Sequence, residues 1–198
     1  IAPDNFQVCE ALGALYLERR QYAQAIPELK QALRLEPSSA PDAVALGEAY
    51  EDSGQIAQAR QILETTHRKD PADATSLEAL AELYSRLKLY QAAINQYKGV
   101  LKLAPNSPIA HNNLAWLYAT CDDPRYRDPK GALDHASIAV RLSGWRQPEF
   151  IDTLAAALFA DGQPKLAAET EGKALQLAPA NREFQASLAR YRQAAGTW

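Results

Sequence analysis

The sequence predicts an all-α fold, a solenoid of about five helix-turn-helix units followed by a C-terminal capping helix. Three observations support this prediction. Small and large apolar residues recur at the same offsets with a period of about 34 residues. Within each period, apolar residues lie four or seven positions apart, which places them on one face of a helix. No segment alternates apolar and polar residues as a half-buried strand would.

The repeated pattern is complete in three copies and altered in two. The first copy consists of Leu12, Gly13, Tyr16, Ala25, Leu29, Ala32 and Pro37. The second consists of Leu46, Gly47, Tyr50, Ala59, Leu63, Thr66 and Pro71, and the third of Leu80, Ala81, Tyr84, Ala93, Tyr97, Val100 and Pro105. The fourth has about five extra residues in its inner turn and consists of His111, Leu114, Ala115, Tyr118, Ala132, Ala136 and Ala139. The fifth consists of Ile151, Leu154, Ala155, Leu158, Ala167, Glu171, Ala174 and Pro179.

These copies predict one domain, 1–198, with units at about 6–39, 40–73, 74–107, 108–147 and 148–181. A last helix, 182–195, has Phe184, Leu188 and Tyr191 on one side and charged residues elsewhere, as a solvating cap would. Helix starts are indicated by four N-cap candidates and three first-turn prolines, namely Asp73, Ser107, Asp128, Asn181, Pro108, Pro129 and Pro148. Gly54 and Gly162 are expected in the turns within units.

The residues quoted above resemble the tetratricopeptide repeat family. The resemblance covers roughly 6–180 and departs from the motif at Gly144, where the closing Pro belongs, and at Leu158, where Tyr is usual. It implies a right-handed α-solenoid that acts as a non-catalytic scaffold and binds a peptide segment or partner protein in its concave groove. The first helix of each repeat lines that groove in this family.

The resemblance assigns ten candidate partner-binding residues to the groove. They are Glu48, Glu51, Glu78, Glu82, Arg86, Asn112, Asn113, Trp116, Asp152 and Phe159. The groove is expected to be acidic at its N-terminal end and amphipathic towards the fourth repeat, with Trp116 and Phe159 as apolar anchors. Asn112 and Asn113 could bond an extended peptide backbone. We therefore expect a neutral to basic ligand with a hydrophobic anchor, unless the glutamates are merely a solvated face and Trp116 only packs between helices.

Family members that clamp the carboxylate tail of a chaperone use Lys, Arg and Asn in the groove, where this chain has mostly Glu, Ala and Val. Such clamp activity is therefore not expected. The stretches 113–120 and 150–155 resemble the closing repeats of large bacterial repeat proteins. This second resemblance implies a bacterial source and an alternative function as a structural or assembly module of a larger multidomain protein, for example in secretion, envelope or polysaccharide machinery. Such a module would act through its ends or through the inserted segment, 121–129.

The first helix also carries Val8 and Leu15 on the side where an earlier repeat would stack. We expect either a fragment of a longer chain or self-association through this helix.

Composition narrows the partner class. A formal net charge of −3 and the absence of a long basic run argue against a nucleic-acid partner. No apolar stretch approaches the roughly 18 residues of a membrane span, so direct membrane insertion is not expected. Cys9 and Cys121 lie in different repeats and are expected to be free thiols, with Cys9 packed and Cys121 more exposed. Free thiols favour the cytoplasm, and the periplasm stays open if the chain belongs to a longer exported protein.

The sequence offers no catalytic residues, cofactor or metal site. His67, His111 and His135 lack metal-ligand spacing, and no phosphate-binding loop or nucleophile motif is present. His111 stands at a bulky packing position. The three aspartates of segment 121–129 do not have calcium-loop spacing, so we expect Asp128 to cap the next helix and the others to pair with Arg125 or Arg127.

Overall fold

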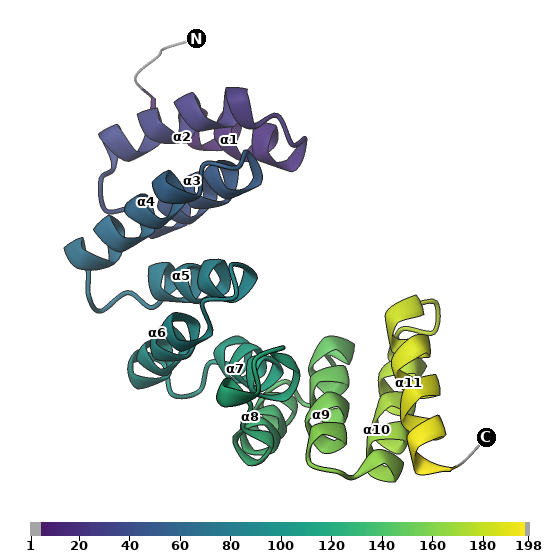
Figure 1. Cartoon of the computed structure of the whole chain (residues 1–198). Helices are drawn as coiled ribbons and strands as arrows, with labels where there is room; N and C mark the ends of the chain where they lie inside the picture. The colour runs from purple at the N-terminus through teal and green to yellow at the C-terminus, as the bar shows by residue number, and fades with distance from the viewer. Residues whose placement is uncertain (1–4, 197–198) are drawn as a thin grey trace.

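The computed structural model describes residues 5–196, and residues 1–4 and 197–198 of the expected domain lie outside the described residues. Within this range the chain forms eleven α-helices and one short 3-10 turn, with no strand (Figure 1). The helices are α1 (Phe6–Glu18), α2 (Tyr22–Leu35), α3 (Ala40–Asp52), α4 (Ile56–Lys69), α5 (Thr75–Arg86), α6 (Tyr90–Leu103), α7 (Pro108–Thr120), α8 (Pro129–Leu142), α9 (Pro148–Ala160), α10 (Pro164–Leu177) and α11 (Arg182–Ala195). The 3-10 turn η1 (Pro124–Tyr126) lies between α7 and α8.

The helices pack as consecutive pairs that stack into a curved array (Figure 1). Each pair joins a first helix to a second helix, from α1 with α2 to α9 with α10, and α11 packs on α10. First helices of neighbouring pairs also touch one another, whereas second helices of neighbouring pairs are further apart. The first helices therefore form the inner, concave layer of the array. The predicted all-α repeat solenoid with a C-terminal capping helix is confirmed.

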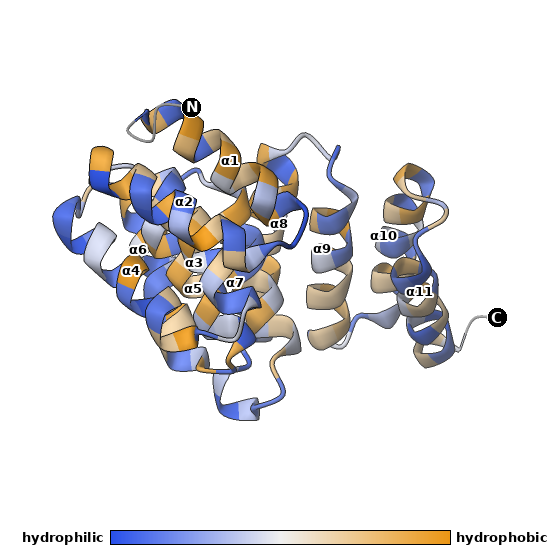
Figure 2. Ribbon diagram, turned by 90° about the horizontal axis from the view of Figure 1, so that it is seen from above, coloured by the Kyte–Doolittle hydropathy of each residue, from blue (hydrophilic) through white to orange (hydrophobic). Residues whose placement is uncertain are grey.

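Small residues bring the paired helices close together. Ala25, Ala59 and Ala93 stand at the same repeat position and are completely buried. At Gly13 an added Cβ would lie 2.6 Å from the Leu29 side chain, so α1 and α2 approach one another where the first helix has no side chain. Figure 2 shows that polar and apolar residues interleave along the helices, as expected when each helix buries one stripe.

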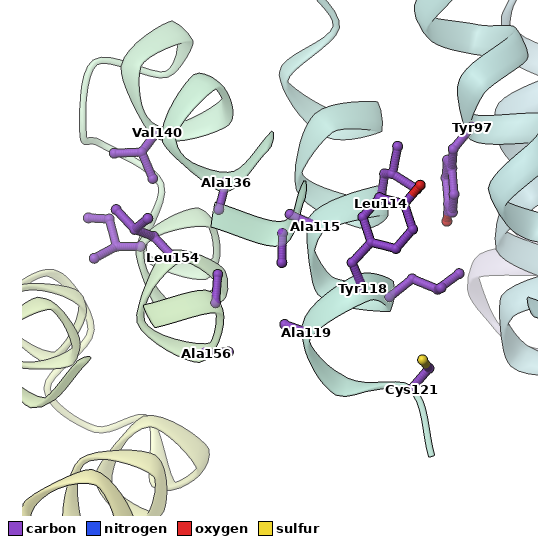
Figure 3. Packing of buried hydrophobic residues seen from close by; sticks show 14 of the residues in the cluster. Tyr97, Leu114, Ala115, Tyr118, Ala119, Cys121, Ala136, Val140, Leu154 and Ala156 are labelled. Carbon is purple, nitrogen blue, oxygen red and sulfur yellow. The ribbon is translucent and has the colours of Figure 1, made fainter. Parts of the chain in front are cut away.

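The largest buried cluster runs from α5 to α11, and Figure 3 shows part of it. It includes Tyr97, Leu114, Val140 and Leu154. The expectation that Cys121 would be more exposed is wrong, because this residue is 5% exposed and belongs to the cluster. The inserted segment folds back over it: Arg127 Nε donates to the Cys121 carbonyl at 2.7 Å, and burial raises the pKa of the Cys121 thiol.

The expected capping residues bond the helix starts. Ser107, Asp128 and Asn181 accept hydrogen bonds from backbone N–H groups of the first turns of α7, α8 and α11. Asp73 accepts one from the Ser76 N–H at 3.2 Å, although α5 itself begins at Thr75. Helices α7, α8 and α9 begin at the three expected prolines, and Gly54 and Gly162 have φ angles of 80° and 77°. None of the described helices combines the length and apolar character needed to cross a membrane.

One core position holds an acid. Glu171 stands at the repeat position of Leu29 and Leu63, and it is completely buried. Among the described residues, no N–H or hydroxyl group donates a hydrogen bond to either carboxyl oxygen of Glu171. Burial and then the charge of the neighbouring Asp152 raise the pKa of Glu171 to about 8, and burial also raises the pKa of Asp152. Glu171 is therefore protonated at neutral pH and can donate to Asp152.

The buried position of Ala93 allows a test of the repeat register. Ala93→Leu places three extra carbon atoms in a close-packed core, and we expect it to lower the free energy of unfolding by about 1–3 kcal/mol. The melting temperature should fall by about 2–4 °C per kcal/mol, which circular dichroism can measure. Ala57→Leu is the matched control because Ala57 is exposed on α4. Equal melting temperatures for the two variants would contradict this packing.

The buried acid predicts an unusual pH dependence of stability. The folded chain holds the Glu171 proton more tightly than the unfolded chain, so this stabilisation is complete below the ordinary pKa near 4.5 and is lost as the pH rises through about 8. Glu171→Gln removes the titration. As the pH rises from 4.5 to 8, the free energy of unfolding of the variant should increase relative to that of the unmodified protein by at least about 1.4 kcal/mol, the equivalent of one pKa unit.

Urea unfolding across that pH range measures the effect. Glu169→Gln changes an exposed acid on the same helix and should follow the unmodified protein at every pH. A constant difference between Glu171→Gln and the unmodified protein at all pH values would show that Glu171 does not titrate in this way.

Candidate functional site

The concave face is hollowed where α5, α7 and the inserted segment meet. The hollow has a volume of about 570 Å³. We call it the central groove and define it by Glu82, Arg86, Asn113, Trp116 and Asp122. Glu82 and Arg86 lie four residues apart on α5, and Asn113 and Trp116 lie three apart on α7, so each pair shares one helix face. The helical register thus brings four of the sequence-predicted residues to one cavity.

Further carboxylates lie near Glu82 on the N-terminal side of the central groove, outside its lining. Burial and then the charge of Glu82 raise the pKa of both Glu48 and Glu78. Glu51 is engaged instead: it accepts from Arg86 Nε at 2.6 Å, and the second carboxylate oxygen pairs with the other guanidinium nitrogen. Arg86 pairs with Glu51, and among the described residues Glu48, Glu78 and Glu82 form no ion pair.

Amide side chains fix the geometry between α5 and α7. Asn113 Nδ2 donates to Glu82 Oε1 at 3.2 Å, and Asn112 Nδ2 donates to Asn113 Oδ1 at 3.2 Å. An amide nitrogen has two protons, so Asn113 can also donate to a ligand. Asn112 Oδ1 is buried and has no donor among the described residues. Tyr97 also borders the groove, and burial raises its pKa to about 12, so its hydroxyl stays protonated.

Trp116 supplies the apolar wall of the central groove. The residue is 45% exposed although it lies on a helix of the inner layer. Its neighbours Leu114 and Ala115 are completely buried. Trp116 therefore presents a large part of its ring to the groove instead of packing fully between helices.

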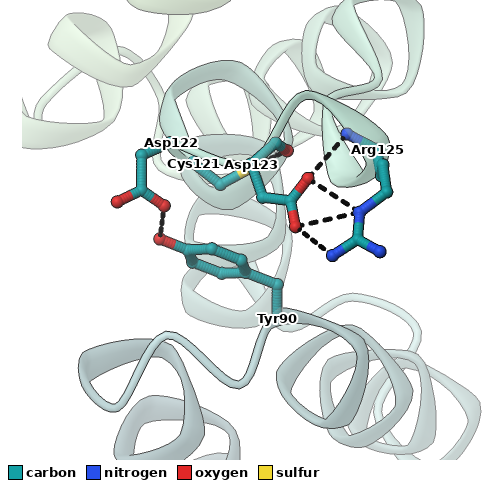
Figure 4. Close-up of polar contacts among 5 residues, drawn as sticks. All are labelled: Tyr90, Cys121, Asp122, Asp123 and Arg125. Atoms are coloured by element: carbon teal, nitrogen blue, oxygen red, sulfur yellow. Dashed lines mark hydrogen bonds and ion pairs between the residues drawn. The ribbon is translucent and has the colours of Figure 1, made fainter.

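The inserted segment closes the C-terminal side of the groove. Asp122 accepts from Lys88 Nζ at 2.5 Å. It also accepts from the Tyr90 hydroxyl (Figure 4). The hydrogen bond from Lys88 is the main cause that lowers the pKa of Asp122. Lys88 and Tyr90 come from the preceding helix pair, a connection that the sequence interpretation missed.

Other charged groups of the segment are paired locally. Asp123 and Arg125 make the expected pair, with a shortest contact of 2.6 Å (Figure 4). Arg127 bonds a backbone carbonyl instead of a carboxylate. Among the described residues, no cluster of histidines, cysteines or carboxylates is arranged to hold a metal ion.

The remaining predicted residues lie apart from the central groove. Phe159 lines a separate hollow of about 320 Å³. Its ring is 4.7 Å from the Tyr191 ring, and the Arg190 guanidinium lies 5.3 Å from its centroid. Phe159 is thus engaged by the capping helix α11. Asp152 faces the buried Glu171 of α10.

Two histidines that lack metal-ligand spacing in the sequence meet in space. His111 Nδ1 lies 2.7 Å from His135 Nδ1, and His111 Nε2 lies 3.0 Å from the Pro105 carbonyl. A carbonyl only accepts, so His111 Nε2 carries the proton and His135 donates to His111 Nδ1. Burial and then the neighbouring His111 lower the pKa of His135. His111 is 6% exposed, which confirms its packing position.

Comparison with known proteins identifies the repeat. Tetratricopeptide repeat models match residues 16–84 and 74–107. A comparison with curated protein sequences finds no match.

Solved structures share the fold at low sequence identity. A thermophilic TPR protein of Thermus thermophilus superposes with a TM-score of 0.73 at 20% identity, over 96% of this chain and 99% of that chain. Pseudomonas aeruginosa PilF gives 0.75 at 20% identity, over 95% and 89% of the two chains. Yeast Tom70 gives 0.80 at 16% identity, over 97% of this chain and 40% of that one. Residues 16–107 therefore carry tetratricopeptide repeats, and the chain shares the fold of tetratricopeptide repeat proteins of known structure.

Proposed function

We propose that this chain is a non-catalytic interaction scaffold whose central groove binds a neutral to basic peptide segment through a hydrophobic anchor. Proteins of this family generally bind proteins or peptides and are generally non-catalytic. The observation that carries the proposal is the exposed Trp116, which stands beside the Glu82 carboxylate and the Asn113 amide.

Each wall of the groove selects one property of the ligand. Trp116 offers apolar surface to a large side chain, and large aromatic residues are enriched among interface hot spots. Glu48, Glu78 and Glu82 attract lysine or arginine and repel a carboxylate. Asn113 can donate to a backbone carbonyl of an extended segment. These three requirements together describe a peptide that carries an apolar anchor near basic residues.

The alternative is a structural or assembly module that acts through its ends. One observation favours it: Leu15 of α1 is 38% exposed at the N-terminal end of the array. In that case the exposed leucine, with the half-buried Val8, would dock another domain or a second copy of the chain. Light scattering tests this alternative. A measured mass that increases with protein concentration, and that no longer does so in Leu15→Lys, would favour it over the groove.

Removal of the indole tests the groove directly. We expect Trp116→Ala to raise the dissociation constant for an arginine-rich peptide with a central leucine by at least roughly tenfold, about 1.4 kcal/mol. Glu82→Lys should raise it further because it reverses a charge at the same wall. The double variant should show no measurable binding by fluorescence anisotropy of the labelled peptide.

The chain provides a matched control for this experiment. Trp145 is also 45% exposed but lies in the turn between α8 and α9, outside the central groove. Trp145→Ala should leave the dissociation constant unchanged. Equal losses from the two tryptophan substitutions, or no loss from either, would contradict binding in the central groove.

The raised carboxylate pKa values predict that binding depends on pH. The pKa values of Glu48 and Glu78 lie above the ordinary carboxylate value of 4.5. Acidification from pH 7 therefore removes the negative charge of these two residues before most surface acids titrate. The affinity for the basic peptide should fall along with this charge. Glu78→Gln should weaken binding roughly threefold at pH 7, about 0.7 kcal/mol, and flatten the decline at lower pH.

The dissociation constant at successive pH values measures this effect, with a histidine-free peptide so that the probe keeps its charge. Glu169→Gln, at an exposed position on α10, should reproduce the unmodified pH profile. A profile that Glu78→Gln leaves as steep as before would mean that Glu78 does not contribute to the attraction.

A further inference from the structure

The outer face carries a second and larger groove between α2 and α4. Its volume is about 740 Å³. The second helices α2 and α4 are spaced apart here, and Leu46 and Tyr50 of α3 form the floor between them. Leu33 of α2 and Ile62 of α4 line the two walls. We call this feature the outer groove.

The rim of the outer groove is basic. Lys30, Arg34 and Lys69 line it, and no carboxylate does. Lys69 Nζ donates to the Pro37 carbonyl at 3.3 Å, and Arg34 contacts the neutral Gln31 side chain. Among the described residues, no carboxylate lies within ion-pair distance of any of the three cations. The outer groove therefore combines apolar walls with positive charges that no carboxylate neutralises.

The equivalent groove one repeat later has a more polar and less basic lining, although its floor is the same and Arg68 stands at the position of Arg34. Leu80 and Tyr84 replace Leu46 and Tyr50 at the floor between α4 and α6. On the walls Glu64 replaces Lys30, His67 replaces Leu33 and Gln96 replaces Ile62.

This second groove is smaller and its acid is satisfied within the fold. Its volume is about 390 Å³. Glu64 accepts from the Tyr84 hydroxyl at 3.1 Å and lies 3.6 Å from Arg60. Because the same repeat position accommodates these polar residues, packing of the solenoid does not require the apolar and basic set of the outer groove.

We propose that the outer groove binds an acidic peptide segment that carries a large apolar side chain. The apolar side chain lies over Leu46 and Tyr50, and flanking carboxylates pair with Lys30, Arg34 and Lys69. Each such charge-assisted hydrogen bond is stronger than a bond between neutral groups. This ligand is opposite in charge to the one proposed for the central groove and docks on the other face, so the chain can hold two partners at once.

The surroundings favour a peptide over a polyanion or a membrane. The chain as a whole has a net charge of −3, which repels an extended nucleic acid beyond the three cations of the rim. The apolar surface is concave and lies between two helices, where a peptide side chain can enter and a lipid headgroup layer cannot follow.

The test uses a fluorescein-labelled peptide with a central Leu-Phe pair flanked by Asp and Glu, and fluorescence anisotropy at low salt. A second peptide replaces each carboxylate with its amide. The unmodified protein should bind the acidic peptide at least tenfold more tightly than the amide peptide. Lys30→Glu, which changes an exposed residue, should raise the dissociation constant of the acidic peptide at least fivefold.

Exchange between the two grooves provides matched variants. The triple substitution Lys30→Glu, Leu33→His and Ile62→Gln gives the outer groove the residues of the next repeat at three wall positions, and it should abolish binding. The reciprocal substitution Glu64→Lys, His67→Leu and Gln96→Ile should create a second site and raise the stoichiometry towards two peptides per chain. Trp116→Ala should leave acidic-peptide binding unchanged, which separates this inference from the proposed function of the central groove.

Any of three results would overturn the proposal. The unmodified protein could fail to bind the acidic peptide, it could bind the amide peptide as tightly as the acidic one, or folded Lys30→Glu could bind the acidic peptide as tightly as the unmodified protein. Two other probes are vesicles of anionic phosphatidylglycerol and single-stranded DNA. If the protein binds either probe at concentrations where the acidic peptide does not bind, and if Lys30→Glu weakens that binding, the groove belongs to a different class of ligand.

Discussion

The close approach of paired helices at small side chains is the constraint on which the rest of the structure depends. Ala25, Ala59 and Ala93 are completely buried, and Gly13 leaves room for Leu29 to reach the backbone of α1. Interiors are packed at crystal-like density, so each contact fixes the separation of two helices within narrow limits. Repetition of the same contact then fixes how successive pairs stack and where the two faces of the array lie.

Curvature turns this packing into two kinds of surface. First helices touch their neighbours and form the inner layer, whereas second helices are spaced apart and leave grooves over the first helix between them. The inner layer carries Glu48, Glu78 and Glu82, while the first outer groove carries Lys30 and Lys69. The repeat determines the backbone of both surfaces and leaves their exposed side chains free to vary, so neighbouring repeats can have opposite charge at equivalent positions.

The fold was predictable from the sequence because the residues of the motif make the contacts that recur in every repeat, within a helix pair and between neighbouring pairs. Helix starts followed from caps such as Ser107 and Asn181, and the core followed from the small-residue positions. Contacts between non-equivalent positions were not predictable. The bond between Tyr90 and Asp122 and the burial of Cys121 depend on how the inserted segment folds back, and no periodic signal encodes that path. Four candidate residues meet in the central groove because they share helix faces.

The C-terminal end shows why the groove residues do not form one continuous site. Phe159 and Asp152 occupy first-helix positions, but α11 packs on α10 and reaches Phe159 of α9. Tyr191 is completely buried against Phe159, and Arg190 lies across both rings. Burial of these aromatic rings closes the end of the core, and it also removes Phe159 as a free anchor. Trp116 stays 45% exposed on the concave face, next to the acidic repeats, and for this reason the proposed binding site lies in the middle of the array.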